Sequence, residues 1–266
     1  MPNLTPYKAL GHSIICLDAP VTLEADADAL VDYADLVSSA TEQNDVLIIV
    51  PFSDPAAAAT FAAFDSVKTS YRIIAACYPG ATGLEPEISV SVAAVISAEA
   101  DPALPFNGLN LPALPRLPSQ FDLLKGEIEA LLQSGVAVIA PDFSGKPAIV
   151  RLITTYQVDP TTGQDDELLL DANAPLILRY VRRVTRRTIE RAPRRKNTRA
   201  QRAQLRSELL AEYLKLDDAE ILQNVRARQQ DLIVTESATD KARANVRVPT
   251  DFVRGMHVVA ATLDVY

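Results

Sequence analysis

The chain has few of the residues from which enzymes build reactive centres. Its 266 residues include only two histidines, two cysteines and no tryptophan. Two cysteines are too few for a disulfide framework or for a zinc site held by several thiolates. Cys16 and Cys77 each lie in an apolar segment, so we expect buried free thiols. A disulfide from Cys16 to a neighbouring copy is the minority alternative, because a reducing cytosol disfavours it.

Catalytic and nucleotide-binding motifs are also missing. His12 and His257 have no second histidine at the spacing of a metal site, and there is no G-x-S-x-G sequence. Gly80–Gly83 lacks the lysine of a phosphate-binding loop, and Ser144–Lys146 falls in a predicted turn. The acidic cluster Asp165–Glu167 lacks the spacing of a calcium loop. We therefore predict no enzyme activity, no cofactor and no metal.

Long hydrophobic runs are absent as well. No uninterrupted apolar run approaches the roughly 18–20 residues that span a bilayer. The N-terminal residues lack the basic and apolar regions of a signal peptide. We expect synthesis in the cytoplasm and no membrane partner.

Charge is segregated along the chain. Residues 1–178 carry 7 basic and 23 acidic side chains, whereas residues 179–206 carry 12 basic and 1 acidic. Steps of three and four place many of these arginines on one helical face. A stripe that binds an acidic partner protein is our first interpretation, a solvated helix face the second and a nucleic-acid patch the third, because the acidic remainder would repel phosphate.

The order of apolar segments indicates an α/β fold. Buried strands are predicted at 45–51 and 71–78, and helices at 24–43, 54–64 and 85–98. This alternation favours a parallel sheet covered by helices. The proline-rich segment 101–118 predicts an extended linker pinned to a surface. A helix at 119–133, with Phe121 and Leu124 facing the core, and a hairpin of 136–140 with 147–156 complete this part.

The C-terminal third combines helices with short strands. Long helices are predicted from about 172 to 191 and from about 198 to 216, separated by a break at Pro193. Strands follow at 231–235, 244–249 and 256–266. We divide the chain into an N-terminal arm (1–23), an α/β core (24–160), a helical and hairpin part (161–249) and a C-terminal arm (250–266).

Both ends of the chain carry short apolar strands, at 12–17 and 256–266. Strands in such positions need a partner edge for their backbone groups. Exchange with a neighbouring copy and pairing of the two terminal strands with each other in one molecule both satisfy this need, and the sequence leaves the two open.

Several segments resemble the contractile tail sheath proteins of Mu-type phages. They include NDVLIIVPFSDPAAAATF, the hairpin ending in RLITTY and the stretch from ILQNVRARQQ to the C-terminus. The resemblance covers most of residues 44–266, and family members are usually longer. It implies a structural subunit that forms stacked hexameric rings around a tail tube and contracts to drive the tube through the cell envelope of a target.

The resemblance also implies roles for particular residues. The expected donor strands comprise Ser13, Ile14, Ile15, Cys16, Leu17, Val258, Val259, Ala260, Ala261, Leu263 and Val265. The expected acceptor hairpin comprises Leu232, Ile233, Val234, Val246 and Val248. From charge, we place the contact with the tube or a neighbour at Arg183, Arg187, Arg191, Arg194 and Arg195.

The implied partners are other copies of the chain, a tail tube protein, and baseplate and sheath-terminator proteins, in a virion tail. A sheath terminator is the nearest alternative function. A nucleic-acid-binding protein that uses Arg179–Arg206 is the alternative from a different class.

Overall fold

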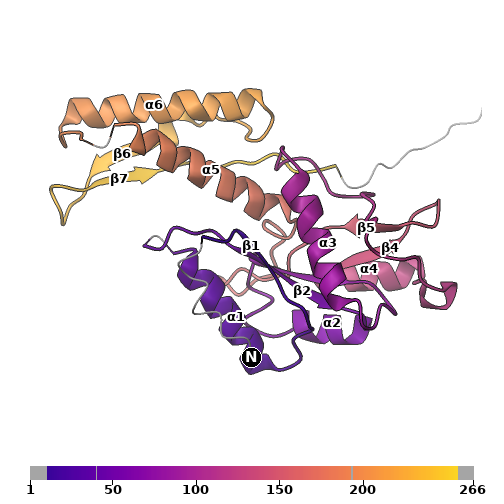
Figure 1. The fold of residues 1–266 in the computed structure, drawn as a ribbon. Helices are drawn as coiled ribbons and strands as arrows, with labels where there is room; N and C mark the ends of the chain where they lie inside the picture. Colours follow the sequence, from indigo (N-terminus) through magenta and orange to yellow (C-terminus); the bar gives the residue numbers. More distant parts are fainter. Residues whose placement is uncertain (1–10, 40, 193, 257–266) are drawn as a thin grey trace, which may run out of the picture. The chain divides into compact units, whose positions relative to one another are not determined.

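The computed structural model describes residues 11–39, 41–192 and 194–256 (Figure 1). These residues divide into two compact units. Unit 1 holds the described residues up to Ala100 together with Pro105–Pro175. Unit 2 holds Asp101–Leu104 and Leu176–Gly255. The N-terminal strand therefore belongs to unit 1.

Unit 1 is built on one five-stranded sheet. Its strands are β1 (Ile14–Cys16), β2 (Leu47–Phe52), β3 (Ile73–Cys77), β4 (Val136–Pro141) and β5 (Pro147–Arg151), side by side in chain order. The first four run parallel and β5 pairs antiparallel to β4. β2 and β3 are fully buried, which explains their unbroken apolar sequences. The predicted α/β fold is confirmed.

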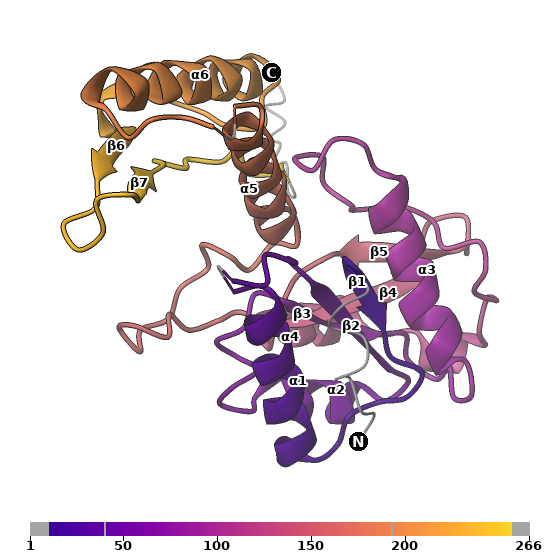
Figure 2. The ribbon, with the colours of Figure 1, turned by 60° about the vertical axis from the view of Figure 1, so that its left-hand side comes forward.

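Helices cover both faces of this sheet (Figure 2). The helices are α1 (Glu24–Val37), α2 (Pro55–Ala62), α3 (Glu85–Ala98) and α4 (Lys125–Gln133). Residues of α1, α2 and α4 share one apolar cluster with Ile48, Val50 and Ala75 of the strands. α3 packs on β1, β2 and β3, and the Ser89 hydroxyl donates to the Leu17 carbonyl at 2.6 Å. The result is three layers, as expected for parallel strands that alternate with helices.

One predicted helix was too long. Residues 119–133 form a short 3₁₀ turn, Ser119–Phe121, followed by α4 from Lys125. The Glu127 carboxylate accepts from the Leu124 backbone N–H at 2.7 Å, which starts the helix there. Phe121 and Leu124 are 37% and 73% exposed, so the prediction that they face the core was wrong.

The proline-rich segment is attached to the sheet, as predicted, but it is not extended, because turns at Asp101–Leu104, Phe106–Leu109 and Leu111–Leu114 interrupt it. Gly108 donates to the Ile149 carbonyl and Leu111 to the Pro147 carbonyl, each at 2.8 Å. The Tyr78 hydroxyl donates to the Pro115 carbonyl at 2.9 Å. The bonds of Gly108 and Leu111 lie along β5, so the outer edge of β5 is covered within the chain.

Unit 2 packs two helices against a hairpin. Its elements are α5 (Asn173–Glu190), which starts at the end of unit 1, α6 (Arg199–Asp218), a 3₁₀ turn (Gln229–Asp231), β6 (Ile233–Glu236) and β7 (Ala244–Arg247). Leu205, Leu209 and Tyr213 of α6 form its core together with Val181 of α5 and Leu232. The Thr185 and Tyr213 hydroxyls are 2.7 Å apart and link the two helices.

The buried aromatic side chain of Phe61 should carry much of the stability of unit 1. It is fully buried between Phe52 and Phe64. We expect Phe61→Ala to lower the free energy of unfolding by about 3–5 kcal/mol, because it leaves a cavity. Phe143→Ala, on a fully exposed turn residue, is the matched control and should change it by less than about 0.5 kcal/mol. Hydrogen exchange of the β2 and β3 amides in urea measures both effects, and equal losses would contradict the core position of Phe61.

Candidate assembly interface

The β6–β7 hairpin has a register that fixes which backbone groups point outward. Ile233 pairs with Arg247 and Thr235 with Asn245, and the Ser237 N–H donates to the Arg243 carbonyl at 2.9 Å. Hydrogen-bonded pairs alternate with non-bonded pairs in an antiparallel ladder. The N–H and C=O groups of residues 233, 235, 245 and 247 therefore point toward the partner strand. Those of residues 234, 236, 244 and 246 point away from it.

The two faces of the hairpin differ in burial. Leu232, Val234, Val246 and Val248 face the unit 2 core beside α6. On the opposite face, Ile233 is 40% exposed. One face is thus held by apolar packing, while the strand edges are left for backbone pairing.

No further strand pairs with β6 or β7 among the described residues. The Arg206 guanidinium covers the start of the β6 edge, because its Nε donates to the Leu232 carbonyl at 2.7 Å and its Nη2 to the Gln229 carbonyl. Along β7, the outward groups of Ala244 and Val246 have no such side chain on them within the described residues. In this register, the backbone groups of the predicted acceptor residues Leu232, Val234, Val246 and Val248 point outward. The backbone groups of Ile233 point toward β7 instead.

The predicted N-terminal donor strand has a partner inside the chain. Ile14, Ile15 and Cys16 pair in parallel with β2, and flanking bonds join Leu17 to Ile49 and Ser13 to Leu47. A donor role for Ser13–Leu17 would require β1 to leave its own sheet, so we do not propose it further. The in-chain partner of β1 is β2, which differs from the pairing between the two terminal strands that the sequence left open.

The C-terminal donor residues Val258, Val259, Ala260, Ala261, Leu263 and Val265 lie outside the described residues. The chain that leads to them is attached to unit 2. Gln223 and Asn224 donate to the Asp251 carboxylate, each at 2.9 Å, and Val253 donates to the Ile221 carbonyl at 3.2 Å. These bonds lower the pKa of Asp251. They anchor residues 249–253 beside the hairpin.

The arginine segment is divided between two tasks. Arg195 pairs with Glu208, Arg191 pairs with Glu212 at 2.7 Å, and Arg202 pairs with Glu236 at 3.2 Å. Arg195 is only 16% exposed. Arg195 and Arg206 therefore serve the fold of unit 2, and we do not keep Arg195 among the contact residues. The spacing of arginines could not reveal this, because the acidic partners lie later in the chain.

A smaller basic set faces solvent. Arg183, Arg187, Arg194, Lys196 and Arg199 are exposed. The Arg183 guanidinium lies over the Tyr180 ring, 5.2 Å from its centroid. Arg191 is 63% exposed although it pairs with Glu212. We refer to these solvent-facing residues as the exposed basic set.

The remaining candidate sites have structural roles. The Asp166 carboxylate accepts from the Tyr156 hydroxyl at 2.8 Å and from the Leu168 N–H at 2.9 Å, so it organises its loop. Burial raises the pKa of the Cys77 thiol to about 12, and both cysteines are free. Within residues 11–256, apart from the two gaps, no group of side chains suits a metal ion. No helix in that part is both long and apolar enough for a bilayer.

Two cavities of unit 1 have polar groups in their lining, and the smaller, of about 380 Å³, lies beside Arg151, Tyr156 and Asp166. The larger, of about 470 Å³, lies between the proline-rich segment and the β4–β5 turn, lined by Leu111, Leu114 and Lys146. The strands of the sheet follow chain order without a reversal, so the sheet lacks the crevice where open α/β folds bind cofactors.

The fold defined by these units is that of tail sheath proteins. The chain resembles the sheath tail protein of Desulfitobacterium hafniense (TM-score 0.61, 15% identity, 88% of this chain, 52% of that chain) and one from Listeria innocua (0.65, 15%, 92%, 55%). It also resembles the contracted helical sheath of the anti-feeding prophage (0.67, 13%, 98%, 74%). No curated protein matches the sequence.

The sequence itself supports the same family. Residues 164–266 match the family model of the phage tail sheath C-terminal domain. This part of the chain is therefore similar to the phage tail sheath family, which is a family of structural proteins and not of enzymes. The chain spans about half the length of the Desulfitobacterium and Listeria proteins.

Unit 2 should lose stability in acid. Arg195 lowers the pKa of Glu208, and Arg191 and Lys215 lower that of Glu212. A carboxylate with a lowered folded-state pKa stabilises the fold above its unfolded pKa, about 4.3 for glutamate, and this contribution is lost as the pH falls through the folded value. We expect the urea concentration at which half of unit 2 is unfolded to decrease when the pH falls below about 4.3. Glu208→Gln should weaken this dependence of the urea midpoint on pH.

Exposed Glu190 supplies the control. Glu190→Gln should leave the pH dependence of unit 2 unchanged. Hydrogen exchange of the α6 amides, measured in urea over a pH series, gives the midpoints. A Glu208→Gln profile that matches the original chain would contradict the importance of the Arg195–Glu208 pair.

Proposed function

We propose that this chain is a structural subunit of a contractile tail sheath and that copies are joined by strand addition. The C-terminal segment, residues 256–266, of one copy would pair with the β6–β7 hairpin of another. The observation that carries this proposal is a hairpin held on one face, with strand edges that have no partner strand among the described residues. Edges of this kind are where extended peptides add to sheets.

The sequence of the C-terminal segment suits that role. Residues 256–266 contain Val258, Ala260, Leu263 and Val265 and only one charged side chain. Each added backbone hydrogen bond contributes about 1 kcal/mol net. Several such bonds per copy, repeated on many sides, would hold a lattice whose single contacts are weak.

The assembly would be a helical sheath of stacked hexameric rings. Structures of similar fold come from the anti-feeding prophage, as a contracted helical sheath and as a baseplate. By analogy, we propose that this chain surrounds a tail tube, meets baseplate and terminator proteins, and contracts after a trigger. Unit 1 would move as a nearly rigid body, because its sheet is covered on both faces.

The exposed basic set would provide a second contact. We place it on Arg183, Arg187 and Arg194, with Arg191 in a shared role with Glu212. Its partner would be an acidic surface of the tube or of a neighbouring copy. Nucleic acid is a weaker candidate, because Arg195, Arg202 and Arg206 are committed to acceptors within unit 2.

Removal of residues 256–266 tests the strand-addition proposal. We expect the full chain to form long hollow tubes at raised concentration and the truncated chain to remain a folded monomer. Negative-stain electron microscopy with circular dichroism distinguishes these results. Single closed rings from the full chain would favour a sheath terminator, and normal tubes from the truncated chain would refute strand addition by this segment.

Charge reversal tests the basic contact. We expect the double variant Arg183→Glu with Arg187→Glu to weaken assembly or tube binding most strongly at low salt, because exposed charges are screened as ionic strength rises. Sedimentation over a salt series measures the effect. The control is Lys125→Glu, a charge reversal on an exposed residue of unit 1 that lies outside the basic set and outside the hairpin. If the original chain, the double variant and the control assembled identically at every salt concentration, the arginines would be only a solvated helix face.

A further inference from the structure

The β6–β7 hairpin needs support that two strands cannot supply themselves. An isolated two-stranded hairpin is marginally stable in water. Packing on α6 fixes its inner face, but the residues that join the strands, Ser237–Arg243, project beyond β6 and β7. Ser237 organises this turn from inside, since its hydroxyl accepts from the Asp240 N–H at 3.4 Å. Asp240 in turn accepts from the Ala242 N–H at 2.8 Å.

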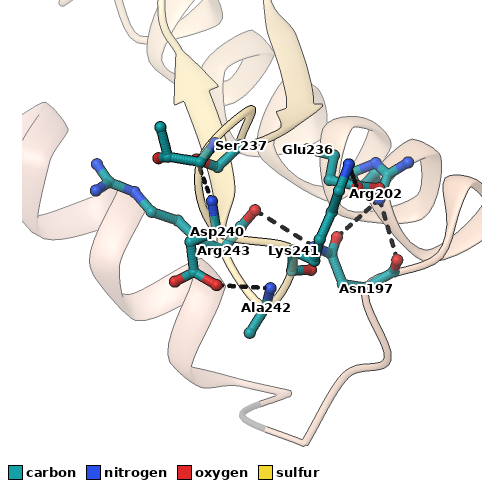
Figure 3. A network of polar contacts seen from close by, with 9 residues as sticks. Asn197, Arg202, Glu236, Ser237, Asp240, Lys241, Ala242 and Arg243 are labelled. Atoms are coloured by element: carbon teal, nitrogen blue, oxygen red, sulfur yellow. Dashed lines mark hydrogen bonds and ion pairs between the residues drawn. The ribbon is translucent and has the colours of Figure 1, made fainter.

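Asn197 ties this turn to the helices (Figure 3). It lies in the connection between α5 and α6, next to Thr198, whose hydroxyl caps α6. The Asn197 side-chain amide donates to the Lys241 carbonyl at 2.6 Å and to the Arg243 carbonyl at 3.3 Å. One side chain therefore holds the turn at the point where β7 begins.

Arg202 holds the Asn197 side chain in place and connects it to the end of β6. Its Nη1 donates to the side-chain carbonyl of Asn197 at 2.8 Å and to the backbone carbonyl at 3.1 Å. The same nitrogen is 3.2 Å from a Glu236 carboxylate oxygen. Arg202 is 18% exposed, so these contacts are partly shielded from water. Lys241 pairs with the other oxygen of Glu236 at 2.9 Å and closes the network.

The network leaves the strand edge itself open. Its contacts fall on Glu236, Lys241 and Arg243, at the turn end of the hairpin. The Arg243 carbonyl already points inward, toward Ser237. Outward groups of Ala244 and Val246 are not used by it. The contacts thus fix the position of β7 without occupying the groups that an added strand would need.

We infer that Asn197 and Arg202 are positioning residues that hold the β7 edge ready for strand addition. This inference rests on the proposed function and adds to it which residues keep the β7 edge ordered. An edge already in its bound conformation loses less conformational entropy when a strand adds, so binding is tighter. Without the network, the hairpin would have to become ordered at each assembly step.

The test uses the full chain and two measurements. The variants are Asn197→Ser, whose shorter hydroxyl cannot bridge the Lys241 and Arg243 carbonyls, and Arg202→Met, which removes the guanidinium and keeps much of the side-chain volume. Lys215→Met is the matched control, because Lys215 is exposed on the same helix and lies outside both the network and the exposed basic set. Hydrogen exchange of residues 233–247 below the assembly concentration reports order in the hairpin. Sedimentation gives the critical concentration for tube formation.

We expect both variants to raise hairpin exchange and to raise the critical concentration at least tenfold. Exchange of the α6 core amides and the circular dichroism spectrum should stay unchanged, which separates positioning from a loss of folding. Should Arg202→Met disturb α6, the milder Asn197→Ser decides. Unchanged critical concentrations in the variants, with tubes formed by the original chain, would overturn the inference. Absence of tubes from the original chain would instead overturn the proposed function and this inference with it.

Discussion

Backbone hydrogen bonding at sheet edges is the constraint on which this molecule depends. Every strand edge has N–H and C=O groups that need acceptors and donors. Unit 1 satisfies them at one edge with the proline-rich segment along β5. Unit 2 leaves the β7 edge without a strand among the described residues. In unit 1, β1 forms the other edge of the sheet and pairs with β2 alone among the described strands, so the edges of β1 and of the β6–β7 hairpin are those without a partner strand in the described residues.

The arginine-rich segment shows how one composition can serve both stability and recognition. Arg195, Arg202 and Arg206 turn inward, toward Glu208, Glu236 and the Leu232 carbonyl. A guanidinium has five donors in a fixed fork and can join several elements at once. Lysines at these positions would supply single charges without that geometry. The high local density of arginine is thus largely a requirement of a small unit with few apolar residues, and only the remainder is available to a partner.

The sequence was sufficient to predict the strands of the sheet and most helices, because apolar runs and helical periodicity are local signals. Pro55 and Asp54 placed the start of α2, and the full span of α3 followed from its pattern. Long-range contacts were harder. The start of α4 at Lys125 was also missed, although it depends on a contact within one turn, where the Glu127 carboxylate accepts from the Leu124 N–H. The in-chain pairing of β1 with β2 could not be separated from strand exchange, because both satisfy the same backbone groups.

The same limit applies to the acceptor hairpin. Alternation of apolar residues identified its strands, but the outward direction of each backbone group depends on register. The bond from Ser237 to Arg243 sets that register, and it makes Val246 available at the edge while Ile233 is used internally. Asn197 and Arg202 stood out in no pattern, since their partners are backbone carbonyls and a glutamate about 34 to 46 positions away. A strand-addition site is therefore defined less by its apolar side chains than by polar residues that keep its edge in place, and those residues become visible only in three dimensions.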